Sequence, residues 1–295
     1  MSVKKLLFRL LPAGVFVSFR NIYRKALKKV YRPLSEDAFK SILKERIGIK
    51  KGSVVFIHSS VDTLNISFSV FRLFEILLET IGPEGTLVFP AWHFTGRAED
   101  YLKRGLVFDV KRSPSVLGLL SELARRHADA RRSIHPINSI VAIGQHAREI
   151  VDEHGQSIYP CDETSPYYKI IKFNGIIAGL GVDTHFLSFV HCPEDVLKQQ
   201  FPVKTRTEQV FEAKVKKQDG TTVIIKTLAA HPQIKYRDIN GFLRKFIKPS
   251  ICLNFTFKGN RFFVAHSKEL FDSIVELSKE NITIYTEQAD IRNSK

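Results

Sequence analysis

A histidine and a glutamate lie three residues apart after an apolar run, in the stretch FLSFVHCPED at residues 186–195. On a helix, His191 and Glu194 would share one face, because positions i and i+3 are neighbours there. A carboxylate beside an imidazole fixes the tautomer of the ring and raises its basicity, as general-base catalysis requires. The spacing suits a catalytic base with its orienting acid, but taken alone HxxE is more often an ordinary pair of side chains on a helix surface.

Metal and thiol chemistry receive less support from the same stretch. HxxE lacks the HExxH pattern, in which two histidines on one helical turn bind zinc, so we predict no metal. Cys192 adjoins His191, but neighbouring helical positions point about 100° apart, so the two side chains diverge. We therefore expect Cys192 to act as a small buried hydrophobe.

Two other segments place polar groups where strands are expected to begin or end. IHSS, at residues 57–60, ends an apolar run with hydroxyls and backbone amides that suit phosphate binding or polarisation of a carbonyl. RRSIHPINSI, at residues 131–140, crowds polar groups ahead of a strand, where ligands bind in open α/β folds. An ordinary polar loop explains the second segment almost as well. GxGxxG and GxxxxGK[ST] are both absent from the sequence, so neither a dinucleotide fold nor a P-loop is predicted.

The elements expected to position these groups alternate between strands and helices. Buried strands are predicted at residues 53–60, 85–94, 139–144 and 175–182, and helices at residues 70–82, 115–127, 145–155, 165–173 and 188–200. Hairpins are predicted at residues 211–228 and 255–267, before a capped amphipathic helix at residues 267–280. We predict an α/β fold with a mostly parallel central sheet, flanking helices, and β-hairpin insertions in the C-terminal third.

Composition and cysteine usage bound the class of protein. The chain has 295 residues, of which 44% are hydrophobic and 25% charged, as in ordinary globular proteins. Three cysteines without CxxC spacing argue against a zinc ribbon and a disulfide framework. A reducing compartment is expected, and with it a cytoplasmic location.

The positive charge is concentrated in an N-terminal arm. The net charge is +15, and residues 1–32 hold nine Lys or Arg and no acid; subtracting these nine leaves +6 for the rest. Apolar residues recur at helical spacing from Phe16 to Val30, which predicts a basic amphipathic helix. It would lie on the inner face of the cell membrane through residues 1–32, or pack on the protein or a subunit. We expect this arm at residues 1–45 and one α/β domain at residues 46–295.

A signal peptide, a transmembrane helix and a nucleic-acid partner are not expected. Arg9 and Pro12 interrupt the apolar run, which is shorter than the roughly 20 residues that span a bilayer. Basic charge alone fits nucleic acid, but no recognition motif accompanies it.

The order of the motifs is more specific than any one of them. Seven segments resemble the aminoglycoside 3-N-acetyltransferase family in sequence and order, most clearly over residues 50–200: VVFIHSSVDTL, IGPEGTLVFPAW, FDVKRSPSVLGLLSELAR, RRSIHPINSIVAIGQHA, TSPYYKI, GIIAGLGV and VHCPED. Members of this family are α/β enzymes that move an acetyl group from acetyl-CoA to an amine on a sugar.

The resemblance implies roles for individual residues. It makes His191 the catalytic histidine and Glu194 its acid, and it adds His135 to the catalytic group. The residues that it implies for the coenzyme and the adjoining cleft are His58, Ser59, Ser60, Ser113, Ser115, Gly118, Arg132, Ser133 and Ser139. The chain departs from the family in two motifs, where Asn65 stands near a usual glycine and His185 at a frequent aspartate.

The acceptor implied by charge differs from the drug substrates of the family. Because cationic drugs suit an acidic enzyme, the basic charge favours an anionic amino sugar, nucleotide- or lipid-linked, from polysaccharide biosynthesis. The alternatives are an aminoglycoside 3-N-acetyltransferase that confers antibiotic resistance, or a non-catalytic member that binds a glycan or a partner. Transfer would be direct, without an acyl-enzyme, and monomer and homodimer both remain open.

Overall fold

The computed structural model describes residues 30–285. The amphipathic helix expected at residues 16–30 therefore lies, except for Val30, outside the described residues. Within the described part of the chain, no helix combines the length and the apolar character needed to cross a bilayer.

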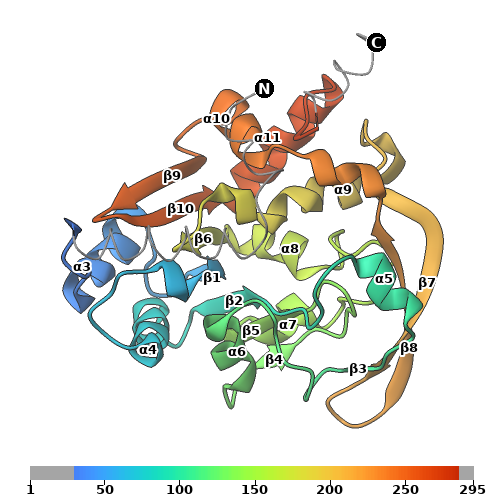
Figure 1. The fold of residues 1–295 in the computed structure, drawn as a ribbon, viewed down its shortest axis with the longest axis horizontal. Helices are drawn as coiled ribbons and strands as arrows, with labels where there is room; N and C mark the ends of the chain where they lie inside the picture. Colours follow the sequence, from blue (N-terminus) through green and yellow to red (C-terminus); the bar gives the residue numbers. More distant parts are fainter. Residues whose placement is uncertain (1–29, 286–295) are drawn as a thin grey trace.

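A seven-stranded sheet in the order β4-β5-β2-β1-β6-β10-β9 forms the centre of the fold (Figure 1). Its strands are β1 Val54–Ser59, β2 Thr86–Pro90, β4 Arg131–Arg132, β5 Ile140–Gly144, β6 Ile176–Leu180, β9 Cys252–Phe257 and β10 Asn260–His266. The central strand β1 pairs in parallel with β2 and β6, while the outer pairs are antiparallel. The α/β class is confirmed, with a sheet that is parallel at its centre and antiparallel at both edges.

The predicted parallel crossover is the link between β1 and β2. It runs through α4, Val70–Ile81, whose N-terminus is capped by the Ser69 hydroxyl, which accepts a hydrogen bond from the Arg72 N–H at 3.1 Å. The helix ends at Gly82, which has φ +66°, a conformation that favours glycine. Because β1 also pairs in parallel with β6, with Ser59 opposite Leu180, the two strands end on the same side of the sheet.

Both faces of the sheet are covered, so its strands are apolar on both sides. On one face, Val55 and Ile57 of β1 join a core with α3 (Glu36–Ser41), α4 and α6 (Leu119–Arg126). On the other face, Phe56 joins the larger core, whose helices are α7 Ala147–Val151, α8 Pro166–Lys169, α9 His191–Leu197, α10 Ile239–Phe246 and α11 Ser267–Lys279. The predicted catalytic pair belongs to the helices of this second face.

A second sheet lies along one side of the molecule (Figure 1). It contains β3 Phe108–Asp109, β7 Arg206–Lys216 and β8 Thr222–Ala230, with α5 Ala98–Lys103 packed against the hairpin. The turn residue Gly220 has φ +89°, as expected for an Asp-Gly hairpin. The hairpin predicted at residues 211–228 is confirmed, and it is longer than expected.

Several boundaries differ from the predicted ones for local reasons. α6 begins at Leu119 rather than at residue 115, because Gly118 has φ +96° and breaks the helical path. β2 ends at Pro90 rather than at residue 94. The hairpin of β9 and β10 extends the central sheet rather than standing apart from it. Leu34 and Phe39, which the sequence placed in the N-terminal arm, are fully buried in the core.

Candidate active site

His191 and Glu194 meet on the first turn of α9. The segment from β6 passes through a short 3₁₀ turn, Ser188–Val190, and His191 begins the helix. His191 Nδ1 lies 2.9 Å from Glu194 Oε2, with the histidine side chain 17% exposed and the glutamate side chain 1% exposed. The two residues therefore share one helix face, as their spacing predicts.

The contact decides which nitrogen of His191 carries the proton. A carboxylate accepts hydrogen bonds, so Nδ1 is the protonated nitrogen and donates to Glu194. Nε2 then carries the lone pair, and it makes no hydrogen bond to any other residue within 30–285. A partly exposed imidazole nitrogen with a free lone pair can accept a proton from a bound molecule.

Glu194 is held from a second side by Tyr285. The tyrosine hydroxyl donates to Oε1 at 3.0 Å, so each carboxylate oxygen has a donor. Burial, and then the neighbouring carboxylate, raise the pKa of Tyr285, which keeps its hydroxyl protonated as a donor. A carboxylate that is almost completely buried requires such partners.

His58 connects the end of β1 to the turn that carries His191. Its Nε2 accepts the Ser188 N–H at 3.3 Å and lies 2.9 Å from the Ser188 hydroxyl. Burial lowers the pKa of His58 to about 3, so the ring is neutral and can accept. The segments at residues 57–60 and 186–195, which the sequence singled out separately, are therefore brought together.

Ser59 and Ser60 lie half-buried beside this junction. The Ser60 N–H donates to the Leu180 carbonyl, so it is already engaged. Neither serine hydroxyl bonds to another of the described residues, which leaves both able to donate to a ligand.

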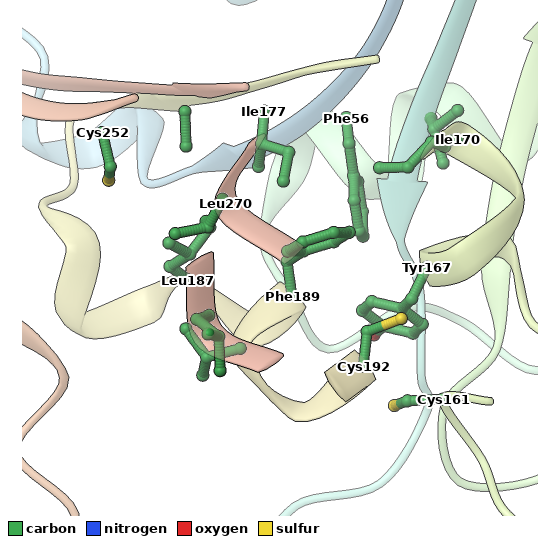
Figure 2. Packing of buried hydrophobic residues seen from close by; sticks show 14 of the residues in the cluster. Phe56, Cys161, Tyr167, Ile170, Ile177, Leu187, Phe189, Cys192, Cys252 and Leu270 are labelled. Atoms are coloured by element: carbon green, nitrogen blue, oxygen red, sulfur yellow. The ribbon is translucent and has the colours of Figure 1, made fainter. Parts of the chain in front are cut away.

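The helix that carries His191 lies on a dense apolar core. Figure 2 shows Phe189 and Leu187, from the turn before α9, among Phe56, Tyr167 and Leu270. Cys192 is fully buried there, and burial raises the pKa of its thiol well above the usual value. Cys161 and Cys252 are also buried and free, so none of the three thiols is placed to act as a nucleophile.

An ion pair joins α9 to the second sheet. Asp195, the neighbour of Glu194, is fully buried and receives two hydrogen bonds of 2.6 Å from Arg206 of β7. The Cys161 N–H donates to the same carboxylate at 2.8 Å. This bidentate ion pair fixes the position of α9, the helix that carries His191.

His135 lies in the interior, where both of its ring nitrogens are occupied. Nδ1 accepts the Asn138 N–H at 3.2 Å, so Nε2 is protonated and donates to the Thr227 hydroxyl at 3.2 Å. The ring stacks on His154 with centroids 4.6 Å apart. His135 is fully buried, so none of its ring atoms is accessible to a ligand. Its hydrogen bond to Thr227 instead links the segment before β5 to β8 of the second sheet.

Arg132, Ser133 and Ser139 are also buried and bind the backbone. Arg132 donates to the carbonyls of Val110 and Ser113 at 3.2 and 2.5 Å, and to that of Ala91. The Ser139 hydroxyl donates to the same Ala91 carbonyl at 2.9 Å, and the Ser133 hydroxyl accepts the Ile140 N–H at 2.9 Å. These groups shape the loops around the end of β2.

Ser113, Ser115 and Gly118 stabilise the turns before α6. The Ser113 hydroxyl accepts the Asp109 N–H at 3.1 Å, and the Ser115 hydroxyl accepts the Leu117 N–H at 3.2 Å. Gly118 is exposed, and no other atom lies within 4 Å of the place that a side chain would take there, so a ligand could approach its backbone.

Known proteins share this sequence pattern and this arrangement of elements. The family model described as aminoglycoside 3-N-acetyltransferase matches residues 56–279, which is more than half of the chain. This chain belongs to that family. The predicted resemblance and the predicted enzyme class, an acetyl-CoA-dependent N-acetyltransferase, are confirmed at the level of the family.

Curated relatives in the family are distant. The aminoglycoside N(3')-acetyltransferase-like protein YokD of Bacillus subtilis (strain 168) is 24% identical over 208 residues, which cover 65% of this chain and 76% of that protein. Aminoglycoside N(3)-acetyltransferase IV of a Salmonella species is 28% identical over 160 residues, which cover 53% of this chain and 58% of that enzyme.

Solved structures of the family share the fold. Aminoglycoside acetyltransferase AAC(3)-Xa superposes with a TM-score of 0.73 over 89% of this chain and 99% of its own, at 19% identity. The binary complex of AAC-IIIb with CoASH superposes with a TM-score of 0.68 over 84% of this chain and 97% of its own, at 17% identity. At these identities the likeness shows a common fold.

The departure at His185 leaves the contact between His191 and Glu194 intact. His185, which stands where many acetyltransferases of this family have aspartate, is exposed and packs edge-on against Phe186. Asp183 caps the following turn by accepting the His185 N–H at 3.0 Å. Glu194 is therefore the acid that orients His191 within the described residues.

Tyr285 and Ser188 are the site residues that the sequence did not indicate. Tyr285 lies 91 positions after Glu194, and no motif surrounds it. Ser188 precedes His191 by three residues but resembles any serine at a helix start. Within residues 30–285, no group of three or more His, Cys, Asp or Glu side chains is arranged to hold a metal ion.

The buried histidines make folding stability depend on pH. Burial lowers the pKa of His58 and of His154 to about 3 each, and that of His135 well below its usual value. The unfolded chain protonates these rings near pH 6.5, so it binds more protons than the folded chain below that pH. The free energy of unfolding should therefore fall as pH drops from 6.5 toward 4, by up to about 1.4 kcal/mol per pH unit for each ring.

Urea unfolding at pH 7, 6 and 5 checks this expectation, with His154→Gln as the test variant and the exposed His185→Gln as its matched control. His154→Gln should flatten the pH dependence and His185→Gln should leave it unchanged. An identical slope in wild type and His154→Gln would contradict the burial of a neutral ring.

Proposed function

We propose that this chain transfers the acetyl group of acetyl-CoA directly to an amine of an amino sugar, with His191 as general base. The observation that carries the proposal is the His191 Nε2 lone pair, which the Glu194 contact leaves free on a partly exposed ring. An ammonium group is not a nucleophile, so the acceptor must lose a proton before or during attack.

The proton follows a defined route in this scheme. The acceptor ammonium first releases one proton to the solvent. The neutral amine nitrogen then forms a bond to the thioester carbonyl carbon while His191 Nε2 takes one of its remaining protons, and Glu194 stabilises the imidazolium that results. When the carbon–sulfur bond breaks, the imidazolium returns a proton to the departing sulfur. The products are an N-acetyl sugar and the free coenzyme thiol, and His191 is neutral again.

The groups nearest to the end of β1 would stabilise the charge on the carbonyl oxygen. The hydroxyls of Ser59 and Ser60 have no partner among residues 30–285, and His58 joins their strand to the turn before His191. We assign them to the thioester side of the reaction. The buried state of all three cysteines supports direct transfer without a covalent acyl-enzyme.

Replacement of His191 by alanine should reduce kcat/KM for acetyl transfer by roughly 10²–10⁴-fold, the usual contribution of a general base. The matched control is His185→Ala, an exposed histidine of the same segment, which should retain wild-type rates. Release of the coenzyme thiol is the measurement. Wild-type rates in His191→Ala, in a variant with an unchanged melting temperature, would remove His191 from the mechanism.

We assign an aminoglycoside as the first acceptor class to test. Relatives named aminoglycoside N(3)-acetyltransferase share the family, and solved complexes of AAC(3)-IVa contain a gentamicin or apramycin. These names support an acceptor that carries several amines on linked sugars.

A second acceptor class, a nucleotide- or lipid-linked amino sugar, is favoured by charge. The chain carries a net charge of +15, which attracts anions rather than cationic drugs. A cavity of about 450 Å³ is lined by Arg244 and Arg261, and it reaches Asp183 in the segment between β6 and α9. Arg261 is paired there with Asp183 at 3.5 Å, so Arg244 is the guanidinium group that would meet a phosphate.

A direct competition between acceptors separates the two classes. We expect gentamicin and apramycin to gain an acetyl group when incubated with acetyl-CoA, and a UDP-linked amino sugar to remain unmodified, as followed by mass spectrometry. The reverse preference would establish the anionic class instead. Transfer to neither, with no rise in melting temperature on addition of acetyl-CoA, would favour a non-catalytic binding protein.

A further inference from the structure

The Glu194 carboxylate is held between two donors from distant parts of the chain. His191 Nδ1 occupies Oε2 from within α9, and the Tyr285 hydroxyl occupies Oε1 from the segment after α11. The glutamate side chain is 1% exposed, so water contributes little to its solvation. The tyrosine therefore supplies the second hydrogen bond to a charge that His191 alone would leave half-satisfied.

The backbone around Tyr285 is fixed well enough to place this hydroxyl. Ile284 and Tyr285 are buried in the core beneath α9, and the Ile284 carbonyl accepts the Asp238 N–H at 2.9 Å. The Tyr285 N–H donates to the Thr283 hydroxyl at 3.1 Å. Glu194 and Tyr285, the two partners in this hydrogen bond, therefore both lie in well-packed parts of the structure.

We propose that Tyr285 is a positioning residue for catalysis, whose hydroxyl donates to Oε1 of Glu194 and so aims Oε2 at His191. The proposal rests on the proposed function in that His191 is taken as the base. Tyr285 acts through Glu194, and it has no contact with the reacting atoms.

Other charged groups face the pair from neighbouring elements. Arg206 and Arg237 act on the tyrosine hydroxyl besides Glu194, and Asp195 acts on Glu194. Burial raises the pKa of Asp195, while its bidentate ion pair with Arg206 favours the carboxylate. Cys161, which also lies near, has a thiol whose pKa is raised well above its usual value by burial, so it stays neutral.

Loss of the hydroxyl should make the His191–Glu194 pair easier to protonate. The hydrogen bond from Tyr285 stabilises the carboxylate most when His191 is neutral, less when His191 is cationic, and least when Glu194 is protonated. Its removal therefore favours either protonated form of the pair over the active, deprotonated form. The midpoint of the first protonation must move to higher pH.

The test uses Tyr285→Phe, which keeps the ring in the core, with Tyr168→Phe as a matched control. Tyr168 belongs to the same apolar cluster, packs edge-on against Phe271 and does not contact Glu194. The protonation of the His191–Glu194 pair is followed in the full chain by NMR of a His191 ring carbon as the pH is varied. The decrease of kcat/KM at low pH is measured in parallel. We expect the midpoint in Tyr285→Phe to rise by about half a unit to two units.

The kinetic readout separates positioning from binding. In Tyr285→Phe, kcat should fall roughly tenfold while KM for acetyl-CoA stays within about twofold, because only the base is disturbed. In a Glu194→Gln background, Tyr285→Phe should cause no further shift of the His191 midpoint, since no carboxylate remains to stabilise.

Three results would overturn the proposal. The first is an unchanged His191 midpoint in a folded Tyr285→Phe variant. The second is an equal shift in Tyr168→Phe. The third is an equal shift when Tyr285→Phe is added to Glu194→Gln. The NMR titration needs no acceptor, so a wild-type protein without acetyl transfer would refute the proposed function while leaving the role of Tyr285 open to this test.

Discussion

The hydrogen bond between His191 Nδ1 and Glu194 Oε2 is the interaction on which the rest of the site depends. It lies within one turn of α9, so the sequence spacing HxxE creates it as soon as the helix forms. Because the carboxylate accepts a hydrogen bond from Nδ1–H, Nε2 is left without a proton on the partly exposed ring. The proposed proton transfer to His191 requires this tautomer.

Elements from every part of the described chain hold that short helix in place. His58 of β1 fixes the turn before it, Asp195 ties it to Arg206 of β7, and Tyr285 reaches it from beyond α11. Phe189 of the turn before this helix belongs to the same apolar core as Phe56, and this packing helps to hold the turn in place (Figure 2). A helix of seven residues could not present a base with accuracy on its own.

Features that depend on neighbouring residues could be predicted from the sequence, whereas contacts between residues far apart in the chain could not. The HxxE pair, the crossover from β1 to β2 and the Asp-Gly hairpin follow from spacing and turn chemistry, and the structure contains each of them. The family resemblance placed His135 in the catalytic group, and the polar residues around it suggested a ligand-binding segment. In the structure its ring is buried and bonded to Asn138 and Thr227. Tyr285 carries no motif, so only the tertiary fold could place it beside Glu194.

The tautomer of His191 in the free protein is the most direct measurement of the central claim. Nitrogen-15 NMR of the histidine rings at neutral pH distinguishes a protonated Nδ1 from a protonated Nε2. We predict that Nδ1 bears the proton in His191 and that Nε2 shows the shift of an unprotonated nitrogen. A proton on Nε2, with Nδ1 bare toward Glu194, would contradict the account.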